Sequence, residues 1–173
     1  PCTYADWEIV VWDDIFDINA FLTRKKGEMM AGKPLDDDIY GMAYQAGKGY
    51  DFSSMQINGF FWQYGGDIWD ESNQPNAQAE GVVNSDVNVE AFEKYLDLLG
   101  TMHPSHKTGN MDIFGIQALY LEGKIASMVN WVGLGAPVVD PKLSKVHDVT
   151  GYARQPGTMQ DDGTISRWAN LGG

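Results

Sequence analysis

The chain has 173 residues with 24 acidic and 12 basic side chains, so its formal net charge at pH 7 is −12. This charge disfavours binding to nucleic acid or to an anionic membrane surface through bulk electrostatics. Apolar residues make up 43% of the chain, enough for one folded domain with a core, and no apolar run reaches the roughly 20 residues that a membrane span needs.

The first half of the chain is predicted to alternate helices with short strands. Apolar side chains spaced three, four and seven residues apart predict an amphipathic helix at the start. Serine caps and paired glycines predict where a second helix begins and ends. In chain order the predicted elements are a helix over 4–22, a polar loop over 25–38, a strand over 39–44, a helix from Ser53 or Ser54 to Tyr64, and a small hairpin with arms 67–70 and 81–84.

The second half is predicted to continue the alternation. Its clearest helix carries an apolar stripe made of Val89, Phe92, Leu96 and Leu99. Because strands and helices interleave along the chain, the predicted fold class is α/β rather than a bundle or a sandwich. In chain order the predicted elements are a helix from Ser85 or Asp86 to Gly100, a helix over 112–122, a strand over 124–131, a loop with one helical turn over 133–141, and strands over 149–153 and 165–171.

Acidic residues are the first candidates for chemistry, and most of their patterns fail. The segment that contains Asp13, Asp14 and Asp17 lacks the central glycine and the distal glutamate of a calcium loop. No phosphate-binding glycine loop and no nucleophile elbow are present, and a single cysteine, Cys2, gives no thiol cluster for zinc. We therefore expect no metal, no cofactor and no nucleotide.

One enzymatic alternative stays open. Asp67 with Asp70 or Glu71 provides two carboxyl groups of the kind that glycoside hydrolases place on either side of a scissile bond. A surface turn explains the same residues equally well, because the spacing between two carboxylates in space does not follow from the sequence.

Aromatic residues at strand ends and turns form the other candidate set. Tyr50 follows a glycine, Trp131 ends a predicted strand beside Asn130, and Trp168 lies beside Arg167. In α/β sheets ligands bind at the carboxyl ends of strands, and an indole covers the apolar face of a sugar ring. For Trp131 and Trp168, packing at the end of the hydrophobic core explains the position equally well. For Trp62 and Trp69, packing in the core or in the hairpin is favoured over ligand binding.

Four motifs in order resemble one protein family, the last of them in two parts. They are FFWQYGGDIWD at 60–70, NSDVNVEAFEKYL at 84–96, FGIQALYLEGKIASMVNW at 114–131, YARQPG at 152–157 and LGG at 171–173. Their order and spacing resemble the substrate-binding proteins of bacterial ABC sugar importers, family 1, which are similar to maltose-binding protein. The resemblance spans nearly the whole chain.

The resemblance implies a fold and a function. Family members have two α/β lobes that close on a sugar. Residues 1–150 would correspond to most of the second lobe, a mixed sheet flanked by helices of the type II-like periplasmic-binding-protein class, and 151–173 to a segment crossing toward the first lobe. The implied role is capture of a sugar or polyol and delivery to ABC permease subunits, without catalysis, in a periplasmic or extracellular location, free or lipid-anchored.

The resemblance also implies the binding residues. Trp131 and Trp168 would stack on the sugar, and polar residues around them would bind its hydroxyl groups. The full predicted set is Tyr50, Asp51, Ser54, Gln56, Asn130, Trp131, Gly133, Arg167, Trp168, Asn170 and Gly172. Because the first lobe is not part of this sequence, we also expect exposed apolar surface that promotes self-association. A third alternative is a protein-interaction domain whose aromatic residues form the contact patch.

Overall fold

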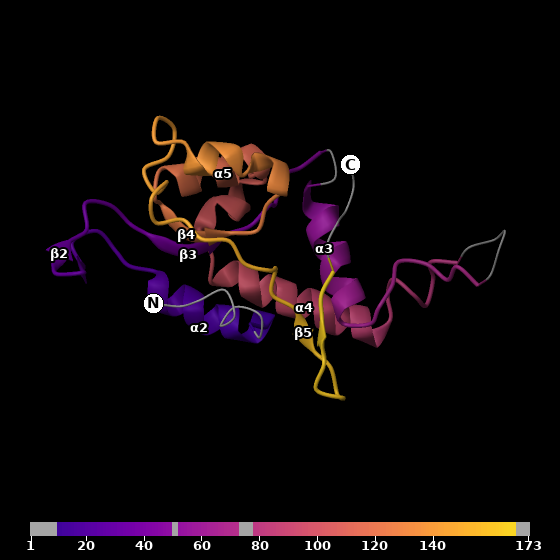
Figure 1. Cartoon of the computed structure of the whole chain (residues 1–173). Helices are drawn as coiled ribbons and strands as arrows, with labels where there is room; N and C mark the ends of the chain where they lie inside the picture. The colour runs from indigo at the N-terminus through magenta and orange to yellow at the C-terminus, as the bar shows by residue number, and fades with distance from the viewer. Residues whose placement is uncertain (1–9, 50–51, 73–77, 169–173) are drawn as a thin grey trace.

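The structure, a computed structural model, describes residues 10–49, 52–72 and 78–168. These residues form a mixed α/β fold in which short strands are interleaved with helices (Figure 1). The helices are α2 (Trp12–Leu22), α3 (Phe52–Gln63), α4 (Asp86–Gly100) and α5 (Ile113–Leu121), with 3-10 turns η1 (Pro104–Thr108), η2 (Val132–Leu134) and η3 (Ala136–Val139). The strands are β1 (Met29–Met30), β2 (Lys33–Pro34), β3 (Tyr40–Ala43), β4 (Ile125–Met128), β5 (Thr158–Met159) and β6 (Ile165–Ser166).

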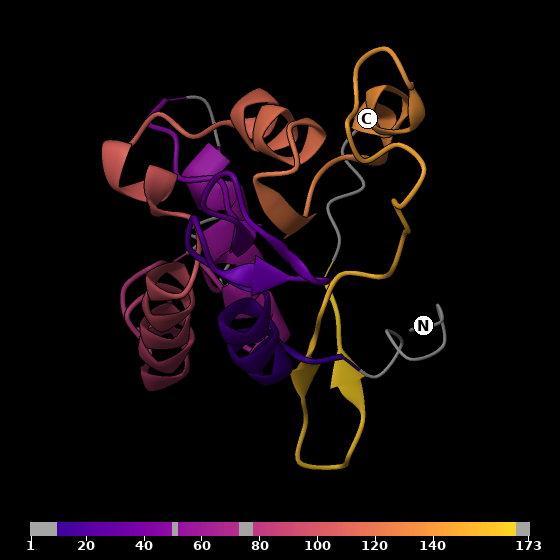
Figure 2. The same ribbon diagram turned by 90° about the vertical axis from the view of Figure 1, so that its left-hand side faces the viewer.

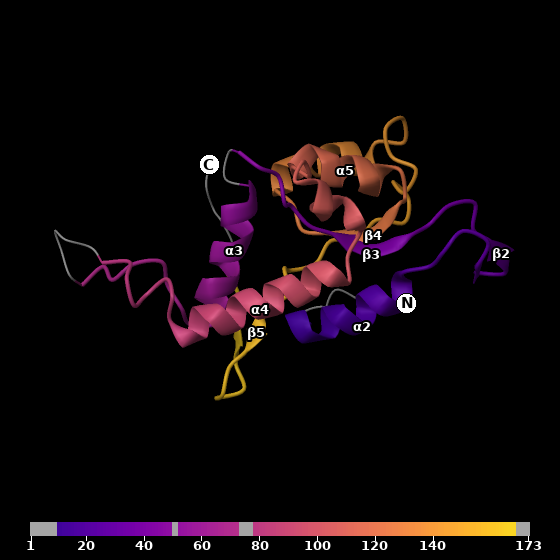
Figure 3. The ribbon, with the colours of Figure 1, turned by 180° about the vertical axis from the view of Figure 1, so that it is seen from behind.

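A parallel pair of strands, β3 and β4, lies at the centre of the molecule. Met42 of β3 is opposite Ser127 of β4, and the crossover between the two strands contains α3, α4 and α5, as parallel pairing requires a long connection. Helix α5 covers one side of the pair, and α2 and α4 lie on the other (Figures 1 and 3). The α/β class predicted from the sequence is therefore confirmed.

The larger core lies between the strand pair and the three helices α2, α3 and α4. The Trp12 ring packs against Phe60 and Tyr44, with ring centroids 4.9 Å and 5.8 Å apart. Its indole N–H donates a 3.0 Å hydrogen bond to Oε1 of Gln63, so the polar edge of the ring is satisfied inside the core. A smaller cluster of Ala43, Ile116 and Ile125 joins α5 to the strand pair.

Helix α2 lies very close to β3 because one position lacks a side chain. A Cβ atom at Gly41 would collide with the main chain and the side chain of Asn19 on α2. The amide nitrogen of Asn19 donates to the hydroxyl of Thr101 at 3.1 Å, which ties α2 to the end of α4.

The helix boundaries differ from the prediction where tertiary contacts decide them. Helix α2 begins at Trp12 rather than at residue 4, and residues 1–9 lie outside the described residues. Val11 is extended because it bridges to Gly157 of the C-terminal segment. Helix α3 begins at Phe52, one residue before the serines expected to cap it. The predicted start and stop of α5 are confirmed: Oδ1 of Asp112 accepts from the Gly115 N–H at 2.7 Å, and Gly123 follows with a φ of 71°.

Helix α4 has the predicted length, but a different face is buried. Its buried residues are Asn88, Ala91, Tyr95 and Leu98. In the stripe expected from the sequence, Val89, Phe92 and Leu96 are 48%, 39% and 50% exposed. The buried face is set by α3 and by Tyr44, which follows β3; they contact the helix from a direction that its apolar pattern alone does not fix.

Four predictions of strands and loops need correction. The segment 149–153 is irregular and has no ladder partner, because β4 pairs on one side with β3 and no strand lies on the other among the described residues. The arms 67–70 and 81–84 do not pair; instead Asp70 bridges to Gln78, and 80–84 is a turn. The polar loop 25–38 contains the short β1–β2 hairpin. The C-terminal strand is shorter than predicted, with β6 pairing with β5, and 169–173 lie outside the described residues (Figure 2).

Candidate functional site

A groove of about 610 Å³ runs along Ala126–Met128 of β4 and continues past the carboxyl end of that strand. One wall is the chain that leaves β4, with Asn130 and Trp131, and continues into η2. The other wall is the irregular segment 149–156, which includes Tyr152 and Arg154. The groove therefore occupies the strand-end position at which α/β proteins bind ligands.

The position of Trp131 at the groove follows from the order of the helix, turn and strand that precede it. Helix α5 ends, Gly123 reverses the chain in a left-handed conformation, and β4 returns along β3. The strand stops after Met128, so the next residues emerge at the sheet edge, and Trp131 is the N-cap residue immediately before η2. Its side chain is partly exposed, as a ring that offers one face to a ligand has to be.

The side-chain amide of Asn130 forms hydrogen bonds within the protein. Its Nδ2 donates to the Ile113 carbonyl at 3.0 Å, and its Oδ1 accepts from the Trp131 N–H at 2.9 Å. The side chain thus joins the end of β4 to the first turn of α5 and holds the main chain of Trp131. Its geometry suits a positioning residue better than the direct sugar contact expected from the resemblance.

The second wall is held in place by hydroxyl groups. The Tyr120 hydroxyl donates to Oγ1 of Thr150 at 3.2 Å, and that oxygen in turn donates to the Val146 carbonyl at 2.8 Å. The Tyr152 hydroxyl donates to the Gly135 carbonyl at 3.4 Å, which links the irregular segment to the turn after η2. Each wall is therefore attached to α5 or to the turns beside it. The two walls are not strands of one sheet.

The structure does not bring all the predicted residues together. Asn130 and Trp131 line the groove, and Gly133 lies in η2 between two lining residues. Trp168 lies elsewhere: its ring contacts Trp62 with centroids 4.7 Å apart and covers Gly59 of α3. The remaining predicted positions are distributed as follows: Ser54 and Gln56 are in α3, Arg167 Nε donates to the Gln155 carbonyl at 3.1 Å, and Tyr50, Asp51, Asn170 and Gly172 lie outside the described residues.

Most groove residues were missed in the sequence, among them four with polar side chains: Tyr120, Thr150, Tyr152 and Arg154. Three of them belong to or follow the segment that the sequence assigns to a strand, where side chains would alternate between two sheet faces. As an irregular wall, the same segment lines the groove with consecutive residues. The Tyr-Ala-Arg-Gln run before a Pro-Gly turn was available as a signal, but its proximity to Trp131 was not.

The carboxylates of the glycosidase alternative accept hydrogen bonds from nearby residues in turns. Oδ1 of Asp67 accepts from the Trp62 indole at 3.2 Å and from the Ile68 N–H at 2.7 Å. Asp70 accepts from the N–H and the hydroxyl of Ser72, and these bonds lower the pKa of Asp70 below its usual range. A lowered pKa is opposite to what a general acid needs, and Asp67, Asp70 and Glu71 do not line the groove beside Trp131.

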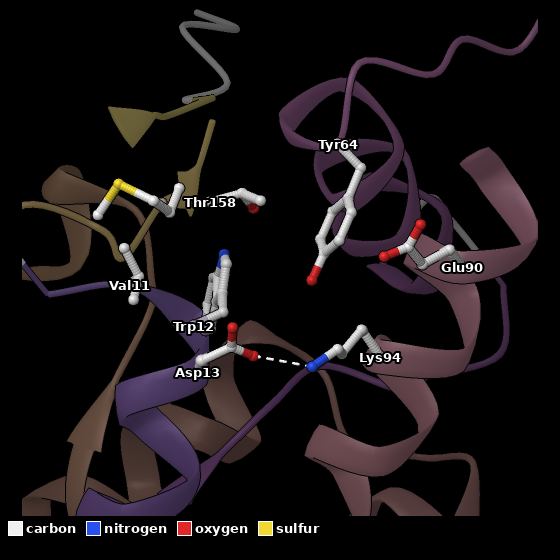
Figure 4. Close-up of a pocket in the computed structure, with 9 residues that line it drawn as sticks. Val11, Trp12, Asp13, Tyr64, Glu90, Lys94 and Thr158 are labelled. Carbon is white, nitrogen blue, oxygen red and sulfur yellow. Dashed lines mark hydrogen bonds and ion pairs between the residues drawn. The ribbon is translucent and has the colours of Figure 1, made fainter. Parts of the chain in front are cut away.

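A second cavity of about 200 Å³ lies where β5 meets α2, α3 and α4 (Figure 4). Its polar wall contains an ion pair between Asp13 and Lys94, with the nitrogen and oxygen 3.0 Å apart. The Tyr64 hydroxyl points into the space above this pair, with Glu90 beside it. Burial, reinforced by the two carboxylates, raises the pKa of Tyr64 to about 12. The carboxylates of Asp13 and Glu90 already have a cation in the same cavity, because Lys94 lines it and forms the ion pair with Asp13.

The chain matches no family model, no curated protein and no solved structure. Among the described residues, no cluster of His, Cys, Asp and Glu side chains is suited to hold a metal ion. None of the helices in the described part of the chain combines the length and the apolar character needed to cross a membrane.

Proposed function

We propose that this chain binds a sugar or polyol in the groove beside Trp131, as one lobe of a two-lobed capture protein that delivers its ligand to an ABC permease. The carrying observation is the position of Trp131: a partly exposed indole at the carboxyl end of a parallel strand, on the wall of a 610 Å³ groove. The ordered sequence segments that resemble the family support the same proposal.

The chemistry of the groove suits a carbohydrate. The indole of Trp131 covers the apolar face of a sugar ring, while hydroxyl and main-chain groups of the opposite wall bind its edge. The mechanism is closure of two lobes around the ligand by a hinge, with no bond made or broken. The proposed location is periplasmic or extracellular, and the proposed partners are the ligand and the permease subunits.

The test is a titration with a panel of sugars and polyols, followed by tryptophan fluorescence. We expect at least one ligand to bind, and we expect Trp131→Ala to lose affinity by about tenfold or more, equivalent to about 1.4 kcal/mol. Trp69→Ala is the matched control. Trp69 is 48% exposed, and its indole donates a hydrogen bond to Glu71 in a turn that does not line the groove.

Two results would contradict the proposal. One is silence across the whole panel with a correctly folded protein. The other is a Trp131→Ala variant that binds as tightly as the original chain. Turnover of a chromogenic glycoside that disappears in Asp70→Asn would favour the hydrolase alternative instead.

A further inference from the structure

Strand β4 has an edge that no other described strand covers. It pairs with β3 on one side only. Tyr40 is opposite Ile125, and its N–H donates to the Lys124 carbonyl at 3.0 Å, while Met42 is opposite Ser127. In a parallel pair, a residue that bonds across the ladder reaches the residues on either side of the one opposite it. The N–H and C=O groups of Ser127 therefore point away from β3, to the free edge.

These two main-chain groups of Ser127 have no partner among the described residues. No hydrogen bond outside the β3–β4 ladder involves them in that part of the chain. The side chain is already engaged, because its Oγ donates to the Gly41 carbonyl at 2.9 Å. Ser127 and the exposed Ala126 both line the groove. The groove therefore contains a main-chain donor and a main-chain acceptor side by side, as an added β-strand requires.

A strand added at this edge would have apolar contacts on both faces of the sheet. Helix α5 covers one face and α2 the other (Figure 1), and the groove lining includes Tyr120 of α5 and Ile15 of α2. Val132 and Val149 of the lining are 96% and 77% exposed, so apolar surface is available there. A strand that is covered on both faces is a continuous apolar run and does not alternate with polar residues.

The charge of the lining favours an uncharged partner. None of the described residues that line the groove is Asp or Glu. Arg154 is the charged residue of this lining, and it already has an interaction partner. A charged side chain brought into the groove would lose hydration without gaining a counter-ion.

We propose that the free edge of β4 binds an extended polypeptide segment of about five uncharged apolar residues, which joins the sheet as a strand beside Ser127. The inference goes beyond the proposed function. The added strand lies along β4, whereas the proposed sugar lies past the end of that strand, at Trp131.

Amide hydrogen exchange followed by NMR tests the proposal at single residues. The probe is a synthetic peptide of about five Val and Ile residues, flanked by Gly and Ser and blocked at both ends. In the free protein, the N–H of Ser127 should exchange faster than those of Ala126 and Met128, which face β3. Saturation with the peptide should slow exchange at Ser127 by about tenfold or more, and should change the other two less.

A second peptide separates strand pairing from apolar contact. It has the same side chains but is N-methylated at two consecutive central residues, which removes a donor from each of its edges. We expect it to bind about tenfold more weakly, since main-chain hydrogen bonds are lost.

Two protein variants assign the pairing to one residue. Ser127→Pro removes the N–H at the free edge and should weaken binding of the first peptide by a similar factor. Ser127→Ala is the matched control, because it also loses the bond from Oγ to Gly41 but keeps the main-chain N–H.

The outcomes are separate from those of the proposed function. Equal binding of the two peptides, with unchanged exchange at Ser127, would overturn the inference whether or not Ser127→Pro folds. Protection of Ser127 that rises with protein concentration in the absence of peptide would identify a second copy as the occupant, and would also overturn it. Peptide binding without sugar binding contradicts only the proposed function, and sugar binding without peptide binding contradicts only this inference.

Discussion

At the scale of single residues, the candidate site depends on one side chain that was expected to touch the ligand. Asn130 uses its amide nitrogen on the Ile113 carbonyl and its oxygen on the Trp131 N–H. Within the described part of the chain, the main-chain nitrogen of Trp131 donates no other hydrogen bond. The orientation of the indole is therefore coupled to helix α5 through Asn130.

Asn130→Ala should loosen Trp131 as well as lower stability. Losing two partly buried hydrogen bonds should reduce the free energy of unfolding by about 1–2 kcal/mol. The diagnostic readout is the near-ultraviolet circular dichroism of Trp131, isolated by subtracting the spectrum of Trp131→Phe, and we expect this signal to collapse. Asn110→Ala, at an exposed loop position, should leave both quantities unchanged. An intact Trp131 signal in Asn130→Ala would show that Asn130 does not position the ring.

At the scale of elements, α4 shows how a helix with apolar residues on two faces is oriented by its neighbours. Leu98 is fully buried against the core, whereas Leu96, two residues earlier, is half exposed. Both are leucines in the same helix, so helix propensity cancels in a comparison of their alanine variants.

Leu98→Ala should lower the free energy of unfolding by about 2–5 kcal/mol, because it removes buried methyl groups and leaves a cavity. Leu96→Ala should change it by about 1 kcal/mol or less, since the residue is already half exposed to solvent. Urea unfolding at neutral pH measures both values. Equal effects of the two variants would contradict the orientation of α4 described above.

At the scale of the whole molecule, buried phenols join the separate elements into one core. Tyr44 follows β3 and Tyr95 belongs to α4; their ring centroids are 6.0 Å apart. Burial raises the pKa of Tyr95 to about 12 and that of Tyr44 well above its usual value. Both rings must therefore stay neutral while the protein is folded.

These shifts predict loss of stability in alkali. An unfolded tyrosine ionises near pH 10, so between pH 10 and 12 the unfolded chain releases protons that the folded Tyr95 retains. Stability is then fully present below pH 10 and falls as the pH approaches 12, by about 2–3 kcal/mol for Tyr95 alone.

Denaturant unfolding between pH 9 and 12, followed with tyrosinate absorbance, tests this expectation. Tyr95→Phe should flatten the pH dependence, and the exposed Tyr152→Phe should retain it. A profile that is identical in Tyr95→Phe and in the original chain would contradict the role of Tyr95.

The expected self-association is a separate prediction at this scale, and the exposed residues Val89, Phe92 and Leu96 provide apolar surface for it.

The sequence by itself determined features that depend on neighbours along the chain. Asp112 and Gly123 bound α5 because a cap and a left-handed glycine act within one helical turn. The same local logic predicted the α/β class and the strand that is β4, although β4 ends at Met128 and not at Trp131 as predicted. These predictions held because the interactions behind them span only a few residues.

Only the tertiary structure decided which surfaces meet. It turned Val89, Phe92 and Leu96 of the predicted α4 stripe toward solvent and kept Leu99 against the core. Among the described residues it left 149–153 without a strand partner, and it placed Trp168 against Trp62 instead of in the groove. It also placed Arg154 in the groove of Trp131, 23 positions earlier in the chain. The physical reason is that burial and pairing depend on contacts between distant segments, and apolar spacing within one segment does not say which partner it will contact.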